Sequence, residues 1–239
     1  MTFMVFIGFD KREKLAWEVC AASMQAHTGE PVTIAPISRS GLIAMGDYHR
    51  PQHEYEGIEY DDLSRAPVST DFAIARFWVP YLAPRGGWAL YCDCDFLWRT
   101  DVRELFALAD PRYAVMVVKH EHKPAETEKM DGQVQTTYPR KNWSSLVLWN
   151  LAHAGGTRLT RHVLNSLPGR DLHAFCWLDE AAIGELPECW NWLDGHSSED
   201  INPSAVHFTR GTPDMRGFER TRYADEWMRY ASALRERRR

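Results

Sequence analysis

The hydrophobic positions near the amino terminus predict a strand, a helix and a second strand. Residues 3–9 form an almost uninterrupted apolar run, which is typical of a strand buried on both faces. Between residues 14 and 27 the apolar positions recur at helical spacing, and a Gly-Glu-Pro sequence at 29–31 ends that pattern. A second apolar run follows at 32–35. The chain therefore opens as a strand-helix-strand unit.

Strand and helix patterns continue to alternate along the rest of the chain. Thr70 can cap a helix over residues 71–79, whose acidic first residue suits the positive end of the helix dipole. After a turn at 85–87, an apolar strand at 88–92 leads directly into Asp93-Cys94-Asp95. Further strands are expected at 114–118, 146–149 and 206–208, and further helices at 102–108, 160–167 and 224–234. This alternation predicts an α/β fold with a mostly parallel central sheet covered by helices on both faces.

The length and composition favour one domain over residues 1–239. A chain of 239 residues with 44% hydrophobic content can bury one substantial core. Within it, the segment at about 119–142 is polar and too long for a routine connection, so we interpret it as a functional or disordered loop. A basic helix is expected at the carboxyl end, at about 224–239.

The charge of the chain excludes a general nucleic-acid binder. The formal net charge is -5, whereas such a protein needs a basic surface that displaces counterions from phosphate. The five cysteines are an odd number at irregular spacing, and the amino terminus lacks a signal-peptide pattern, so we expect a reduced, cytoplasmic protein.

Membrane contact is expected to be peripheral at most, because charge or proline interrupts every apolar run. The arginine-rich end at 235–239 has two interpretations. It is a solvated helix end that complements the helix dipole, or it adheres to the anionic inner face of a membrane and so brings the protein to a lipid-linked acceptor.

The strongest chemical signal is the pair Asp93 and Asp95 at the end of an apolar strand. Ligands of open α/β sheets bind at the carboxyl ends of the strands. A diphosphate held through Mg²⁺ or Mn²⁺ requires hard oxygen ligands that leave coordination positions free, and two aspartates with one further ligand provide them. Alone, however, Asp-x-Asp in a loop is more often a solvated turn.

Three later motifs follow in an informative order. A strand bracketed by asparagines occupies 142–150, an acidic pair opens a short helix at 177–183, and Val-His-Phe-Thr-Arg-Gly-Thr-Pro occupies 206–213. With these motifs in this order, the chain from about residue 5 to 213 resembles the family-eight glycosyltransferases of the GT-A (Rossmann-like) fold. That family includes glycogenin, galactinol synthase and bacterial lipooligosaccharide sugar transferases.

The resemblance implies a set of site residues. The metal, Mn²⁺ or Mg²⁺, would be bound by Asp93, Asp95 and His207. The nucleoside diphosphate sugar would be bound by Gly8, Phe9, Asp10, Arg76, Asp93, Asn142, Ser144, Ser145, Arg210 and Gly211. Among these, residues 8–10 would contact the base and ribose, and Arg76 the donor. The catalytic pair beside the donor sugar would be Asp179 and Glu180.

The chain departs from the family at several of these positions. Arg210 and Pro213 stand where the family has glycine and lysine, and Gly211 is shifted by one residue. We expect Arg210 to replace the lysine as phosphate clamp, exchanging a point charge for a planar fork. Glutamate replaces glutamine at position 180, and serine replaces glycine at Ser145, so the identity of the donor sugar does not transfer.

Several of these residues also have a structural interpretation. A lone histidine at a strand end, such as His207, is more often a core residue than a ligand. Arg76 can pair with a neighbouring carboxylate on a helix face, and Asp179 and Glu180 can simply begin a helix. Flat apolar faces for a sugar ring are available near the site on Trp98, Trp143 and Trp177.

The expected reaction is glycosyl transfer from a nucleoside diphosphate sugar to an acceptor hydroxyl. The resemblance implies a UDP-sugar donor, retention of anomeric configuration, and Asp179 or Glu180 as support for the cationic sugar. The acceptor is unknown, with a cell-surface glycan or a lipid-linked saccharide as candidates. One alternative is a sugar-nucleotide pyrophosphorylase, although residues 9–13 lack the glycines of its phosphate loop. A second is a catalytically silent nucleotide- or carbohydrate-binding domain, which metal-dependent turnover would exclude.

Overall fold

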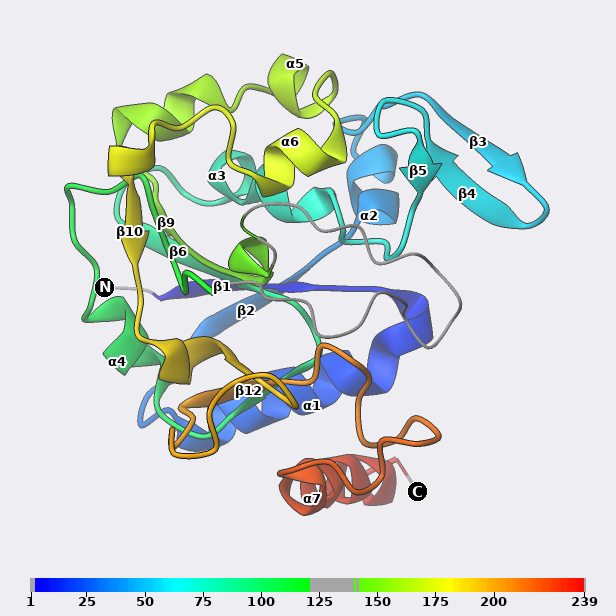
Figure 1. The fold of residues 1–239 in the computed structure, drawn as a ribbon, viewed down its shortest axis with the longest axis vertical. Helices are drawn as coiled ribbons and strands as arrows, with labels where there is room; N and C mark the ends of the chain where they lie inside the picture. The colour runs from blue at the N-terminus through cyan, green and yellow to red at the C-terminus, as the bar shows by residue number, and fades with distance from the viewer. Residues whose placement is uncertain (1–2, 121–139, 141, 239) are drawn as a thin grey trace.

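A six-stranded sheet forms the centre of the protein, with the strand order β10-β8-β9-β6-β1-β2 (Figure 1). The computed structural model describes residues 3–120, 140 and 142–238. Strand β9 runs antiparallel to its neighbours β6 and β8, and the other neighbouring pairs are parallel. The strands are Met4–Gly8 (β1), Thr33–Ile37 (β2), Trp88–Cys92 (β6), Val115–Val117 (β8), Leu146–Asn150 (β9) and Ile183–Glu185 (β10). The predicted mostly parallel α/β sheet is confirmed.

The four inner strands β8, β9, β6 and β1 are buried on both faces, and their side chains alternate between two hydrophobic cores. Val5, Ile7 and Leu90 belong to the core on one face, whereas Phe6 and Tyr91 belong to the core on the other. This explains why the strands read as continuous apolar runs in the sequence.

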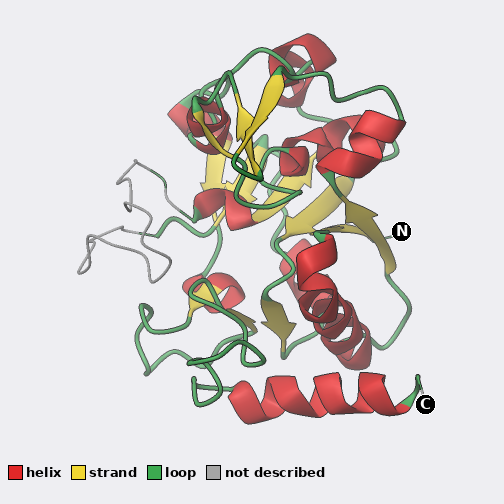
Figure 2. Ribbon diagram, turned by 90° about the vertical axis from the view of Figure 1, so that its right-hand side faces the viewer, coloured by secondary structure: helices red, strands yellow, loops and turns green. Residues whose placement is uncertain are grey.

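The first core lies between the sheet and a layer that contains the longest helices. Helix α1 packs on strand β1 and on helix α7, and these helices lie together on one side of the sheet (Figure 2). A small sheet of order β11-β12-β7 completes this layer. The elements are Lys14–His27 (α1), Val102–Phe106 (α4), Ala224–Glu236 (α7), Phe96–Trp98 (β7), Trp192–Leu193 (β11) and Ala205–His207 (β12).

Short helices cover the second face, and a small antiparallel sheet lies beside them (Figure 1). The helices are Arg39–Ala44 (α2), Val79–Leu82 (α3), Arg161–Leu164 (α5) and Gly169–His173 (α6). The small sheet contains Gln52–Tyr55 (β3), Ile58–Asp61 (β4) and Ala66–Pro67 (β5). The 3-10 helices are Lys11–Glu13 (η1), Ala75–Trp78 (η2), Trp143–Ser145 (η3), Ala154–Arg158 (η4), Glu180–Ala182 (η5) and Glu188–Asn191 (η6).

The predicted helix over residues 71–79 is wrong as a single α-helix. The chain turns at 71–74, forms the 3-10 helix η2 and continues as the short helix α3. The carboxylate of Asp71 accepts from the Arg39 side chain and from Ser40 in the first turn of α2, so it faces the amino terminus of α2 and not that of a helix over 71–79. Residues 75–79 are buried on all sides, so the apolar positions that suggested a helix do not form one stripe.

The hairpin of β3 and β4 was not predicted from the sequence. Glu56 and Gly57 both have positive φ, 51° and 77°, which is the backbone of a two-residue hairpin turn. Both strands are mostly exposed and polar, so no apolar alternation marked them.

Two expectations concern segments at the limits of the described structure. Most of the expected polar loop at 119–142 lies outside the described residues, which omit 121–139 and 141. Arg239 at the carboxyl end is also outside them. Among the helices that the structure does describe, none combines the length and apolar character that are needed to cross a bilayer.

Candidate metal centre

The carboxyl edge of the central sheet brings Asp93 next to the start of β9. Strand β6 ends at Cys92, which pairs with Leu146 at the beginning of the antiparallel strand β9. The backbone N–H of Asp93 donates to the carbonyl of Ser145 at 2.9 Å. The Asp-x-Asp segment and the Asn142–Ser145 segment, which are far apart in the sequence, therefore meet at one edge.

The pairing of β7 with β12 brings His207 to Asp95. His207 pairs with Phe96 in this antiparallel ladder, and the N–H of Phe208 donates to the carbonyl of Asp95 at 3.0 Å. The His207 Nε2 atom lies 3.3 Å from Asp95 Oδ1. One ligand atom from each of Asp93, Asp95 and His207 lies within 4.8 Å of the others. The three residues form a group that can hold a metal ion.

Asp93 is held by one buried cation and one hydroxyl. Arg76 Nη2 lies 3.0 Å from Asp93 Oδ1, and Tyr91 Oη donates to the same oxygen at 2.6 Å. Arg76 Nη1 also donates to the carbonyl of Ser144 at 2.9 Å. Burial raises the pKa of Asp93, and the charge of Asp95 adds to that effect while Arg76 opposes it. The guanidinium therefore does not fully offset the cost of the buried negative charge.

Glu13 adds a further acidic group that the sequence reasoning missed. Its Oε2 accepts from the Cys94 thiol at 2.9 Å. Burial raises the pKa of Glu13, and Asp95, Asp10 and Asp93 raise it further. Because Glu13 comes from the 3-10 helix η1, no motif spacing connects it with the Asp-x-Asp segment.

The side chain of His207 is fixed on two sides. Its Nδ1 lies 2.8 Å from Asn191 Oδ1, and its ring stacks on Phe96 with centroids 4.4 Å apart. Both His207 and Asn191 are buried. Asn191 is a second residue that the sequence reasoning missed, because its position beside His207 depends on how η6 packs.

The donor atoms fit a divalent cation. Asp95 Oδ1 is buried and has no hydrogen-bond partner among the residues that the structure describes. Two carboxylates and one imidazole nitrogen are ligands suited to ions such as Mn²⁺, with carboxylates also suited to Mg²⁺. A cation in the group of Asp93, Asp95 and His207 would satisfy the unpaired oxygen and neutralise the buried acidic charge.

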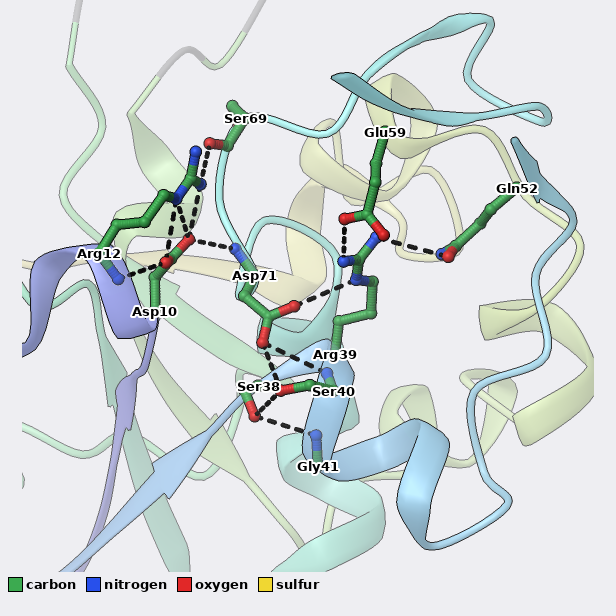
Figure 3. Close-up of polar contacts among 10 residues, drawn as sticks. All are labelled: Asp10, Arg12, Ser38, Arg39, Ser40, Gly41, Gln52, Glu59, Ser69 and Asp71. Carbon is green, nitrogen blue, oxygen red and sulfur yellow. Dashed lines mark hydrogen bonds and ion pairs between the residues drawn. The ribbon is translucent and has the colours of Figure 1, made fainter. Parts of the chain in front are cut away.

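Asp10, at the end of β1, is engaged in a different network (Figure 3). Its carboxylate accepts from the backbone N–H of Arg12 at 2.9 Å and of Asp71 at 3.0 Å, and pairs with the Arg12 guanidinium at 2.6 Å. Burial alone would raise the pKa of Asp10, but these hydrogen bonds lower it to about 2. Asp71 binds Arg39, which in turn pairs with Glu59 of β4. The network ties the loop after β1 to α2 and the hairpin.

Gly8 and Phe9 complete this loop. A Cβ on Gly8 would lie 2.6 Å from Phe72 Cγ and 2.7 Å from Tyr91 Oη, so only glycine fits there. The N–H of Phe9 donates to the carbonyl of Ile37 at 2.8 Å. Gly8 thus permits the close approach of the Tyr91 hydroxyl that binds Asp93.

The predicted residues before β9 lie at the same edge. Asn142 has a left-handed backbone, with φ 65°, and its carbonyl accepts from Ser145 Oγ at 2.6 Å. Ser144 Oγ lies 2.7 Å from His173 Nδ1. Burial, followed by the charge of Arg76, lowers the pKa of His173 to about 3, so this histidine is neutral and can accept from the hydroxyl.

The acidic pair Asp179 and Glu180 is exposed and lies outside the group of three metal-binding candidates. Asp179 lies 3.7 Å from Arg158, and its side chain is 84% exposed. Glu180 pairs with Arg140 and lies 3.7 Å from Lys119. Asp179 precedes η5 but makes no side-chain capping hydrogen bond. Its position is therefore not explained by capping.

Arg210 and Gly211 lie in the loop after β12. Arg210 is exposed, and its Nη1 lies only 2.8 Å from where a Cβ on Gly195 would be. Burial raises the pKa of nearby Asp194, and Arg210 opposes that effect. Gly211 has φ 148°, and a Cβ there would lie 2.7 Å from the ring of Phe218.

The arrangement of the sheet, its helices and this edge is that of GT-A glycosyltransferases. The bifunctional glycosyltransferase WbbM matches 97% of this chain and 50% of its own, with 15% identity and a TM-score of 0.64. Glycosyltransferase GlyE of Streptococcus pneumoniae matches 96% of this chain and 61% of its own, with 14% identity and a TM-score of 0.61. Galactosyltransferase LgtC in complex with donor and acceptor sugar analogues matches 97% of this chain and 96% of its own, with 14% identity and a TM-score of 0.59.

These likenesses confirm the predicted GT-A fold, and the chain spans about half the length of WbbM. No family model matches the sequence. Protein CDI of Arabidopsis thaliana is 42% identical over 231 residues, which cover 95% of this chain and 85% of that protein. The chain belongs to the family of Protein CDI.

Proposed function

We propose that this protein is a metal-dependent glycosyltransferase. It transfers a sugar from a nucleoside diphosphate sugar, with a UDP-sugar as the expected donor, to an acceptor hydroxyl with retention of configuration. The observation that carries this proposal is the group of Asp93, Asp95 and His207, which lies at the carboxyl edge of a GT-A sheet. Ligands of open α/β sheets bind at this edge.

Each residue of this edge has a role in the proposed reaction. Asp93, Asp95 and His207 hold Mn²⁺ or Mg²⁺, which when bound stabilises negative charge on the departing diphosphate. Arg76 orients Asp93 through the 3.0 Å contact. Arg210, exposed beside this region, binds a phosphate oxygen through its planar fork.

The loops beside the metal group bind the rest of the donor. Gly8 and Phe9 contact the base and ribose with backbone atoms, and Asp10 holds their loop in shape through the bonds from Arg12 and Asp71. The segment with Asn142, Ser144 and Ser145, together with Gly211, lines the diphosphate and sugar.

Donor turnover tests the proposal directly. The protein is incubated with Mn²⁺ and a panel of UDP-, GDP-, ADP- and CDP-sugars, and release of nucleoside diphosphate is measured. We expect slow release from one donor class that EDTA abolishes. Formation of nucleoside triphosphate from a donor and pyrophosphate would instead establish a pyrophosphorylase. Donor binding without turnover, with every donor, would establish a silent binding domain.

We further propose that Asp179 or Glu180 supports the cationic sugar in the transition state. Both are exposed and free of the metal group, so they are accessible to a substrate. Asp179→Asn and Glu180→Gln are compared with Glu185→Gln, which removes an exposed acid from the same chain segment. A loss of kcat of about tenfold in one of the first two variants alone is expected. Equal kcat in all three variants contradicts the role.

The reaction is proposed to occur in the cytoplasm, with at most peripheral contact with the inner face of the membrane. The five cysteines are free thiols, which suits a reducing compartment. Arg238 pairs with Glu18, so part of the basic carboxyl-terminal charge is already neutralised within the fold. Sedimentation with anionic vesicles, with and without residues 235–239, tests membrane contact. A glycan or lipid-linked saccharide is the proposed acceptor.

A further inference from the structure

A chain of buried hydrogen bonds connects the segment before β9 to the imidazole of His207. Asn191 is fully buried. Its Nδ2 lies 3.0 Å from Ser145 Oγ and 3.4 Å from the carbonyl of Asn142. On its other side, Asn191 Oδ1 lies 2.8 Å from His207 Nδ1. None of the motifs that carry the proposed function includes Asn191.

The hydrogen bonds determine which way the Asn191 amide faces. Ser145 Oγ donates its one proton to the carbonyl of Asn142 at 2.6 Å, so toward Asn191 it can only accept. The carbonyl of Asn142 also only accepts. Asn191 must therefore direct its NH₂ group to these two atoms and its oxygen to His207. An oxygen at 2.8 Å from Nδ1 requires that Nδ1 carries a proton.

With the proton on Nδ1, the neutral form of the His207 imidazole carries its lone pair on Nε2, which faces Asp95. Nε2 and Asp95 Oδ1 are 3.3 Å apart, and within the described part of the chain Oδ1 has no hydrogen-bond partner. In this form two acceptor atoms face each other, and a metal cation bound between them relieves the arrangement. Stacking on Phe96 fixes the plane of the ring, so the lone pair has one direction.

We propose that Asn191 is a positioning residue that holds His207 in the Nδ1–H tautomer and directs Nε2 toward the metal. This inference rests on the proposed function, because it assigns a role within the same metal group. Ligating histidines commonly donate their second N–H to a fixed acceptor, and removal of such an acceptor weakens metal binding by about 10–100-fold. Here a neutral amide takes that place.

The test uses variants of similar side-chain volume. Asn191→Leu removes both the acceptor and the donors, whereas Asn191→Asp keeps an oxygen that faces Nδ1. The control is Asn150→Leu, because Asn150 is also buried and hydrogen-bonded, to the carbonyl of Tyr113 at 2.9 Å, on the central strand β9. Loss of stability alone should affect Asn150→Leu and Asn191→Leu in the same way.

Two measurements are made on the full-length chain without substrate. Long-range ¹H–¹⁵N NMR of the metal-free protein identifies the His207 tautomer, with the signal assigned by its absence in His207→Ala. Mn²⁺ titration followed by electron paramagnetic resonance gives the affinity for the metal alone. We expect the Nδ1–H tautomer in the wild type, in Asn191→Asp and in Asn150→Leu. Asn191→Leu should lose this tautomer and bind Mn²⁺ about 10–100-fold more weakly.

An unchanged tautomer and unchanged Mn²⁺ affinity in Asn191→Leu would overturn the inference, as would equal changes in Asn150→Leu. If the wild type bound no Mn²⁺, the metal-dependent function would fail. The tautomer comparison between Asn191→Leu and Asn191→Asp would then still decide whether Asn191 sets the state of His207.

Discussion

Asp10 and Asp93 follow two neighbouring parallel strands, β1 and β6, and both carboxylates are largely buried. Their pKa values nevertheless move in opposite directions. Burial favours the neutral form of both, but hydrogen bonds from Arg12 and Asp71 lower the pKa of Asp10 to about 2. Burial raises the pKa of Asp93, and the carboxylate of Asp95 contributes to the rise.

The difference lies in the neighbours of the two side chains rather than in their depth. Asp10 is surrounded by donors, so the fold itself satisfies its charge. Asp93 shares its site with Asp95 and Glu13, and Arg76 is the cation that the described structure gives it. A carboxylate satisfied by its own chain supports structure, whereas a cluster with excess negative charge is suited to a metal.

The largest expected effect is the loss of activity in Asp95→Asn. The amide keeps the volume but removes an anionic ligand, so we expect glycosyl transfer to fall by roughly 100-fold or more. Without metal, the new NH₂ can donate to His207 Nε2, which faces position 95 at 3.3 Å. The metal-free Tm should therefore not decrease, but the stabilisation by Mn²⁺ should disappear. Full activity at limiting Mn²⁺ would contradict the metal role.

The second effect concerns Gly8, which ends β1 and packs against Tyr91, the residue whose hydroxyl donates to Asp93. In Gly8→Ala the new Cβ would meet Phe72 and the Tyr91 hydroxyl, both within 2.7 Å. We expect a loss of about 1–3 kcal/mol in the free energy of unfolding, measured in urea. Gly156→Ala is the control, because its Cβ would meet Asn150 O at 3.8 Å, an ordinary contact. If the two variants had the same free energy of unfolding, the prediction that a Cβ at position 8 destabilises the fold would be wrong.

The third effect is the pH dependence of stability in Asp10→Asn. The folded pKa of about 2 lies below the unfolded value, so the carboxylate stabilises the fold above about pH 4 and loses that contribution toward pH 2. We expect Asp10→Asn to be less stable by about 1–2 kcal/mol at pH 6, with a smaller difference at pH 3. Urea unfolding at pH 6, 4 and 3 measures it. A constant difference across this range contradicts the prediction.

Asp93→Asn should change the stability in the opposite direction to Asp10→Asn. Because burial raises the pKa of Asp93, its ionised form costs stability at neutral pH, and the neutral amide removes that cost. The metal-free Tm of Asp93→Asn should equal or exceed that of the wild type at pH 7. If both aspartate variants lost stability to the same extent, the contrast between the two sites would be wrong.

The smallest effect is expected at the exposed acidic pair. Asp179 and Glu180 are 84% and 62% exposed in their side chains, so their ion pairs contribute little to stability. Asp179→Asn and Glu180→Gln should each change the free energy of unfolding by less than about 1 kcal/mol. A larger loss, measured by urea unfolding, would indicate a structural role instead of the proposed one in transfer.

The sequence predicted the elements that are long or buried on both faces. Helix α1 and strand β6 have the predicted bounds, because helical periodicity or an uninterrupted apolar run marked them. It did not predict β7, a strand of 3 residues that are all buried and show no periodicity. Yet β7 is the strand that places His207 beside Asp95.

The residues of the candidate site also fall into those that the sequence predicted and those that it did not. Asp93, Asp95 and His207 were expected together because the order of the motifs resembles a known family. Asn191 and Glu13 were not, because their contacts with the site arise from short 3-10 helices whose packing leaves no pattern in the sequence.

The most direct test of the central claim is the position of the metal. Crystals of the wild type soaked in Mn²⁺ are measured near the manganese absorption edge, and an anomalous difference map locates the ion. The account predicts one strong peak bonded to the carboxylates of Asp93 and Asp95 and to Nε2 of His207. A map without a peak at these three side chains would contradict it.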